Sequence, residues 1–351
     1  MSQTMLKPVI MGLVVSAALT TTAAAQPAQG PGGGGPPGAA VRTITQVTPN
    51  LYKVNSGPGV AAVTVFLVTD DGIILADTLN PEFAAWLKGE LAARFPGKPV
   101  KWVIESHYHW DHSRGGGQFA DTATFVGHEN MRTNLRLRIS QARPPGNTDD
   151  LDGDNRLDKN EAQTGTLGIF DRMDTDHDGF LTQDELIADV RWPDIVFKDR
   201  YTITLGGKHA QLLWAGNRHT SDLIDVYFPE ERVLFAGDYI WINRMCCNFA
   251  FDRRPMATWI ASIKALESLD FDTLVNSHYE SGTKADLVAF RRWLEDLQAA
   301  VSAGIKGGKS VDELQATIKL DQYKGWVGYD MQLPGIIESA YDSLARYSPK
   351  D

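Results

Sequence analysis

Cysteine is the scarcest residue that bears on the fold class, because the 351-residue chain has two, adjacent at positions 246 and 247. Two neighbouring cysteines exclude a disulfide-rich scaffold and a zinc site built from several thiolates. Positive charge is also scarce: 34 Lys and Arg stand against 44 Asp and Glu, a net charge of −10. This balance disfavours binding to nucleic acid or to an anionic membrane surface.

The sequence also lacks an apolar run long enough to span a bilayer, which takes about 20 residues. A shorter apolar stretch, from Val9 to about Leu19, follows Lys7 and precedes Ala23-Ala24-Ala25, an A-x-A cleavage site. This layout predicts a secretory signal peptide over residues 1–25 rather than a membrane anchor. We therefore expect an exported protein, periplasmic or secreted, with no integral membrane segment after processing.

After a Gly/Pro-rich linker at residues 26–40, short apolar runs typical of strands alternate with longer stretches of helical spacing. This alternation predicts an α/β fold with several hairpins. Such an alternation is typical of helices layered around two sheets. Strands are expected at Val63–Thr69, Gly72–Asp77, Val100–Glu105, Thr124–Gly127, Tyr201–Leu205, His209–Trp214, Leu223–Phe228, Val233–Ala236 and Thr273–Asn276. Helices are expected at Pro81–Phe95, Glu129–Ile139 and Met256–Leu269, and through most of the last 65 residues.

Metal-binding groups are concentrated in the loop Ser106–His112, after the third expected strand. Three of the eight histidines of the chain fall within six positions there. The spacing turns His107 and His109 one way and leaves Asp111 and His112 free to face a second point. Imidazole and carboxylate are suitable ligands for zinc and similar divalent ions. A polar surface loop, the alternative, would rarely carry three histidines so close together.

Further candidate ligands follow later strands: His219, Asp238 and His278. Loops at strand ends are where α/β folds place their chemistry. A single histidine is more often structural, but as a set these residues complete two metal shells. Asp77, at the end of the second strand, is either a partner that orients a ligand histidine or a cap of the strand end.

The ordered set His107-x-His109-x-Asp111-His112, His219, Asp238 and His278 resembles the metallo-β-lactamase superfamily, over about residues 45–145 and 195–285. The resemblance implies an αβ/βα sandwich. It implies that His107, His109 and His219 hold one metal ion, that Asp111, His112 and His278 hold a second, and that Asp238 bridges the two. Zinc is the ion implied, with iron or manganese as alternatives. The sequence departs from the family pattern at Arg218, where a small residue is common, and beside His278, where many members have glycine.

The activity implied is hydrolysis of a small-molecule substrate. Two neighbouring metal ions make hydroxide available at neutral pH, and Asp111 would orient this nucleophile. Antibiotic-hydrolysing members usually lack an aspartate at the position of Asp238, so an ester, lactone, thioester or amide is favoured and a β-lactam is an alternative. A calcium-binding or interaction protein on an inactive hydrolase scaffold is the alternative from another class. All seven ligands are present, which disfavours it.

Residues 147–194 carry the whole excess of negative charge, with 14 Asp and Glu against 4 Lys and Arg. The run from Asp174 to Glu185 matches the 12-residue EF-hand calcium loop, with Gly179 at the sharp turn. A second copy lies 24 residues upstream and has Asn155 at the turn, which weakens that site without excluding it. The ligand positions are Asp150, Asp152, Asp154, Arg156 through its carbonyl, Asp158 and Glu161 in the first loop, and Asp174, Asp176, Asp178, Phe180, Thr182 and Glu185 in the second.

Two matching loops in tandem predict an insert that binds calcium and pairs through Leu157 and Leu181; the alternative is an acidic solvated loop. Calcium is abundant outside the cell, so we expect a structural rather than a signalling role. The expected organisation is a signal peptide at 1–25, a linker at 26–40 and a hydrolase domain at 41–351, interrupted by the EF-hand pair at 147–192.

Overall fold

The structure is a computed structural model that describes residues 42–57, 62–137, 150, 152–162, 167, 169–245, 251 and 255–347. The expected signal peptide and linker and the pair Cys246-Cys247 lie outside the described residues. The described residues all belong to one compact unit. None of their helices is both long and apolar enough to cross a membrane.

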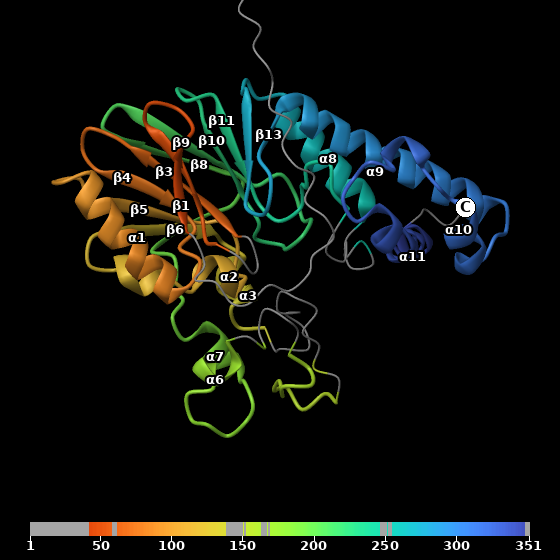
Figure 1. The fold of residues 1–351 in the computed structure, drawn as a ribbon, viewed down its shortest axis with the longest axis horizontal. Coiled ribbons are helices and arrows are strands. Elements are labelled where there is room, and N and C mark those ends of the chain that lie inside the picture. Colours follow the sequence, from red (N-terminus) through yellow and green to blue (C-terminus); the bar gives the residue numbers. More distant parts are fainter. Residues whose placement is uncertain are drawn as a thin grey trace, which may run out of the picture. The chain divides into compact units, whose positions relative to one another are not determined.

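Two sheets form the centre of this unit (Figure 1). In the first, strands β1 to β7 lie in chain order, antiparallel up to β4 and parallel from β4 to β7. Its strands are β1 Thr43–Gln46, β2 Leu51–Asn55, β3 Val63–Val68, β4 Ile73–Ala76, β5 Val100–Glu105, β6 Thr124–His128 and β7 Ile195–Phe197.

The second sheet has the order β13-β12-β11-β10-β9-β8 and is antiparallel except between β11 and β12. Gly206 and Gly207, with φ of 51° and 75°, make the predicted hairpin turn between β8 and β9. The strands are β8 Arg200–Leu205, β9 Lys208–Leu213, β10 Asp225–Phe228, β11 Val233–Ala236, β12 Thr273–Asn276 and β13 Gly282–Thr283.

Helices cover the outer face of each sheet. Asn80 caps α1, because its side chain accepts the backbone N–H of Phe83 at 3.0 Å and Pro81 takes the first helical position. A capping box of Thr283 and Asp286 begins α9. The helices are α1 Pro81–Arg94, α2 Trp110–Ser113, η1 Gly116–Phe119, α3 Met131–Asn134, α6 Phe170–Met173, α7 Gln183–Ile187, α8 Met256–Glu267, α9 Lys284–Lys306, α10 Val311–Thr317, η2 Asp321–Tyr323 and α11 Tyr329–Tyr347.

Alternating side chains on the buried strands build the layers. In β11, Val233 and Phe235 pack between the two sheets, whereas Leu234 and Ala236 pack with α8 and α9. β4 divides its side chains in the same way between the second sheet and α1. Both faces of these strands are covered, which is why they read as continuous apolar runs. The predicted αβ/βα sandwich is confirmed.

One predicted helix is much shorter than expected. Of the segment Glu129–Ile139, the described part holds only α3, Met131–Asn134. The two asparagines at its ends are weak helix formers and bond elsewhere: Asn130 donates to the carbonyl of Ser221 at 2.9 Å, and Asn134 to the carboxylate of Asp222 at 2.7 Å. These tertiary contacts replace a further turn of helix.

Backbone hydrogen bonds join the two sheets at one edge. The N–H of Ile224 donates to the carbonyl of Ser106 at 2.9 Å, and the N–H of Val63 donates to the carbonyl of Ser277 at 2.6 Å. This is the edge at which the parallel strands β4, β5, β11 and β12 reach their carboxyl ends. It is therefore the place where side chains from both sheets can meet.

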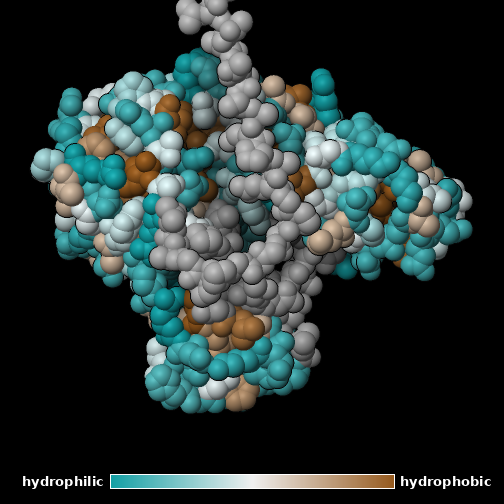
Figure 2. Space-filling model, viewed as in Figure 1, coloured by the Kyte–Doolittle hydropathy of each residue, from teal (hydrophilic) through white to brown (hydrophobic). Residues whose placement is uncertain are grey.

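Figure 2 shows that the described surface on one face is mainly hydrophilic, with scattered apolar positions. Few large apolar side chains of the described residues are exposed, namely Leu167, Val327, Met331 and Tyr347.

Candidate metal centres

The seven predicted hydrolytic ligands come together at this edge of the sheets. They form two groups in which the ligand atoms lie within 4.8 Å of one another, and Asp238 belongs to both. Each ligand follows a strand, so the chain reaches the site from both sheets. The groups are His107, His109, His219 and Asp238, and Asp111, His112, His278 and Asp238. His219 lies in the first group and His278 in the second.

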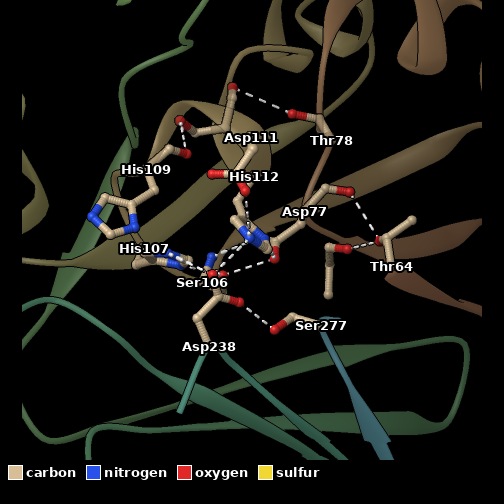
Figure 3. Close-up of polar contacts among 12 residues, drawn as sticks. Thr64, Asp77, Thr78, Ser106, His107, His109, Asp111, His112, Asp238 and Ser277 are labelled. Carbon is tan, nitrogen blue, oxygen red and sulfur yellow. Dashed lines mark hydrogen bonds and ion pairs between the residues drawn. The ribbon is translucent and has the colours of Figure 1, made fainter. Parts of the chain in front are cut away.

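A single oxygen of Asp238 lies at the centre. Its Oδ2 is 3.2 Å from Nε2 of both His112 and His278, 3.7 Å from Nε2 of His107 and 3.8 Å from Nε2 of His219. The other oxygen, Oδ1, accepts the hydroxyl of Ser277. Figure 3 shows the side chains of Asp238, His107 and His112 pointing toward one another. One carboxylate oxygen thus faces four imidazoles.

Asp77 and Ser106 set the orientation of two of these imidazoles. Asp77 Oδ2 lies 3.0 Å from Nδ1 of His112, and Ser106 Oγ lies 3.0 Å from Nδ1 of His107. The Ser106 hydroxyl donates its one hydrogen to Asp77 at 2.7 Å, so it accepts from Nδ1–H of His107. His107 therefore carries its proton on Nδ1 and presents Nε2 with a free lone pair to the cluster. Nδ1 of His112 faces Asp77 in the same way, so Nε2 of that ring is also directed at the cluster. Burial lowers the pKa of His112, but Asp238 and Asp111 outweigh it and hold this pKa well above its usual value.

These contacts decide between the two roles that the sequence left open for Asp77. It contacts a ligand histidine, and its Oδ1 also accepts the backbone N–H of Ser106 at 2.8 Å. The sequence analysis missed Ser106 and Ser277. The available signal was position, since each serine directly precedes a ligand histidine at the end of a strand.

The donor set fits a pair of cations. Nε2 of His219 lies 3.1 Å from Nδ1 of His109, and Nε2 of His112 lies 3.2 Å from Nε2 of His278. Such facing nitrogens need either a shared proton or a common cation. Buried His107 Nε2 and Asp111 Oδ1 have no hydrogen-bond partner among the described residues. Nitrogen and carboxylate donors of this kind suit zinc and similar ions.

Burial and mutual proximity shift the pKa values within the cluster. Burial lowers the pKa of His107 and His109 well below the usual value, and that of His219 to about 4. Burial raises the pKa of Asp238, but His112 and His278 outweigh it and hold the pKa of this carboxyl well below its usual range. The first group is therefore neutral imidazole beside an ionised carboxylate, which is the protonation state that metal binding requires.

The acidic insert brings the ends of each predicted calcium loop together. Carboxylates of Asp150, Asp152 and Glu161 lie within 4.8 Å of one another, and so do those of Asp174, Asp176 and Glu185. Among the described residues, Asp154, Asp158 and Asp178 are not part of these groups. Asp154 and Asp178 instead accept the backbone N–H groups of Arg156 and Phe180, each at 2.8 Å.

The turns and the pairing of the two loops follow the sequence-based expectation. Asn155 has φ of 65° and Gly179 has φ of 86°, so both turn positions adopt the left-handed conformation. Leu157 and Leu181 form an antiparallel bridge with N–H to carbonyl distances of 3.0 and 2.8 Å. Both leucines are buried with Phe170, Met173 and Leu186 in a small apolar cluster.

The fold and the site together define an enzyme of the metallohydrolase class. The chain belongs to the metallo-β-lactamase superfamily, whose family model matches residues 58–278, more than half of the chain. This superfamily typically holds a dinuclear metal site, and the two groups that share Asp238 agree with it.

The following relatives are similar to the chain at low sequence identity. The chain is 23% identical over 267 residues to the 2,4-dinitroanisole O-demethylase subunit alpha of Nocardioides sp. (strain JS1661), a match that covers 74% of this chain and 65% of that protein. It is similar to a metallo-β-lactamase structure from Pontibacter korlensis, with 17% identity, a TM-score of 0.50 and coverage of 73% and 99%. It is also similar to a stereoselective inverting sec-alkylsulfatase from Pseudomonas sp., with 17% identity, a TM-score of 0.59 and coverage of 88% and 50%. At these identities the solved structures show the fold alone.

Proposed function

We propose that the protein is an exported hydrolase whose seven histidine and aspartate ligands hold two metal ions. The observation that carries this proposal is the position of Asp238 Oδ2, within 3.2–3.8 Å of imidazole nitrogens from both groups. His107, His109 and His219 are assigned to the first ion, Asp111, His112 and His278 to the second, and Asp238 to both. Zinc suits this donor set best, with iron or manganese as alternatives.

Bound metal ions would supply Lewis acidity and a water of lowered pKa. The residues of the chain orient the reacting groups. Asp111 Oδ2 lies 3.6 Å from Nε2 of His112 and 3.7 Å from Nε2 of His278, while its buried Oδ1 has no partner among the described residues. Oδ1 is therefore placed to accept the proton of an attacking water. Asp77 and Ser106 keep their histidines in one tautomer through this step.

The substrate proposed is a small molecule with an ester, lactone, thioester or amide bond, and a β-lactam is the alternative on the same site. The similarity to a protein named as an O-demethylase adds an aryl methyl ether to the bonds worth testing. Metal analysis of the purified protein, followed by a panel of these substrates and a phosphodiester, tests the proposal. Two metal ions without turnover of any substrate would favour the inactive-scaffold alternative.

We also propose that residues 147–192 form an EF-hand pair that binds calcium structurally. The clustered carboxylates, the left-handed Asn155 and Gly179 and the bridge between Leu157 and Leu181 support it. Calorimetric titration of the metal-free protein with calcium tests the pair. No heat of binding at millimolar calcium would contradict it.

Export is proposed from residues 1–25, which have the layout of a signal peptide. Mass spectrometry of the protein recovered from the periplasm or the medium is expected to show a chain that begins at Gln26. An intact Met1 on protein that stays in the cytoplasm would contradict export.

A further inference from the structure

A buried charged network lies beside two of the proposed ligands without being part of the ligand set. Arg218 directly precedes His219, and Tyr239 directly follows Asp238. Asp225, the first residue of β10, lies between them. All three side chains are fully buried. The network thus adjoins two members of the first metal group, His219 and Asp238.

Three contacts hold the guanidinium of Arg218, and a fourth joins Tyr239 to Asp225. Its Nη2 donates to Asp225 Oδ2 at 2.6 Å, and its Nη1 donates to the carbonyl of Gly216 at 2.9 Å. The hydroxyl of Tyr239 donates to the same oxygen of Asp225 at 3.1 Å. The guanidinium carbon also lies 4.3 Å from the centre of the Tyr239 ring, a cation–π contact.

These contacts join the two parts of the chain that supply His219 and Asp238. Arg218 lies in the long loop between β9 and β10, which brings in His219, whereas Tyr239 follows β11, which brings in Asp238. Nε2 of His219 and Oδ2 of Asp238 are 3.8 Å apart. A buried ion pair is a weak source of stability, since apolar residues of similar size often serve as well. Its position beside both ligands points to a geometric role.

We propose that Arg218, Asp225 and Tyr239 are positioning residues that hold His219 and Asp238 at the separation required by the first metal ion. The inference rests on the proposed metal centre, because it assigns that ion to His107, His109 and His219 with Asp238. Loss of the network frees the loop of His219 to move relative to β11. Apart from Asp238, the network adjoins none of the residues assigned to the second ion. The affinity for this second ion is therefore affected less.

Cobalt(II) binding to the metal-free protein tests this role. The double variant Arg218→Met with Asp225→Val removes both charges, so no unpaired charge remains buried. Titration with cobalt(II), followed by its visible absorption, is expected to show two sites in the wild type. In the double variant one site should weaken at least about tenfold, the range typical for partners of metal ligands. Circular dichroism and thermal unfolding establish that the variant is folded.

A control removes an ion pair away from the metal groups, that of Arg291 in α9 with Glu267 in α8, by Arg291→Met and Glu267→Gln. Both cobalt(II) affinities should then stay at the wild-type values. Tyr239→Phe, which keeps the ion pair and loses only the hydroxyl, should weaken the same site by a smaller factor. It provides the test if the double variant does not fold.

Unchanged cobalt(II) affinities and spectra in the double variant, or in Tyr239→Phe if that variant alone folds, would overturn the positioning role and leave the metal centre in place. A wild-type protein that binds no cobalt(II) would instead remove the metal centre, and the inference with it.

Discussion

At the scale of single residues, the site is built from groups that neutralise one another. Burial by itself raises the pKa of Asp111 and Asp238 and lowers that of the histidines, yet the groups lie close enough to offset much of that cost. Two cations would balance the carboxylates and take the free imidazole lone pairs.

Replacing Asp111 by Asn should lower kcat by at least about 10²-fold, because the amide cannot take a proton from water. The fold should survive, since the side chain has few partners other than the cluster. Steady-state kinetics on whichever substrate the panel finds, together with circular dichroism, provide the measurement. Activity within a factor of about three of the wild type would reject the role of Asp111.

Replacing Asp77 by Asn should weaken metal binding by about 10- to 100-fold, because His112 loses the carboxylate that fixes its tautomer. Isothermal titration with zinc measures the change. Asp222→Asn is the control: Asp222 is equally buried, but its partners are Asn134, Thr220 and the backbone of Tyr108 rather than an imidazole. Equal losses in the two variants would show a general effect of buried aspartates rather than control of His112.

Asp222 also gives a prediction for pH. Burial raises its pKa to about 6, above the value near 3.9 of an unfolded chain. The folded state therefore binds more protons between these values, and the contribution of Asp222 to stability is present below pH 4 and lost as pH rises through 6. The free energy of unfolding of Asp222→Asn should thus rise relative to that of the wild type by on the order of 1–3 kcal/mol between pH 4 and 7.

Urea unfolding of both metal-free proteins at several pH values measures this difference. A difference in unfolding free energy that does not change with pH would mean that Asp222 is ionised throughout.

At the scale of elements, the insert contacts the loop that carries the hydrolytic ligands. Val190 packs with Tyr108, which lies between His107 and His109. Ile187, at the end of α7, packs against this cluster and against the leucine pair of the insert. Arg114, next to α2, forms an ion pair with Asp189 at 2.9 Å. An ordered insert therefore supports the ligand loop from outside, without supplying a ligand.

Calcium binding should stabilise the protein by mass action, by about 2.7 kcal/mol for one site at a calcium concentration 100 times Kd. A chelator that prefers calcium to zinc should therefore lower Tm, and Glu185→Gln should lower it similarly. Asp171→Asn is the control, since Asp171 lies in the insert but outside both loops and pairs with Lys159. Differential scanning calorimetry with and without calcium measures the effect.

A Tm that does not respond to calcium would contradict the calcium proposal. A loss of turnover at unchanged Tm would show that the insert acts on the site through Tyr108 and Arg114, and calcium would then be regulatory rather than structural.

At the scale of the whole molecule, the sequence predicted the parts that depend on residue type and local order. β5, β11 and β12 lie where they were expected, because most of their residues are buried and each strand has an apolar centre or end. The edge strand β1 was missed, since three of its four residues are exposed and its pattern is polar. The seven ligands were predicted because histidine and aspartate at strand ends carry a chemical signal.

The remaining site residues could not be predicted because they depend on tertiary contacts. Ser106 acts through Asp77, which lies 29 residues away, and Arg218 acts through Asp225 and Tyr239 across two strands. Ser106, Arg218 and Tyr239 each adjoin a ligand in the sequence, but only the folded chain shows which groups they contact.

The transition-metal content of the purified protein tests the central claim most directly. Elemental analysis after expression in metal-replete medium should give two zinc, iron or manganese ions per chain, with calcium counted separately. Asp238→Ala should reduce this number, because Asp238 Oδ2 faces both groups. A wild-type protein that carries less than one such ion per chain, or an Asp238→Ala variant that still carries two, would contradict the shared-carboxylate centre.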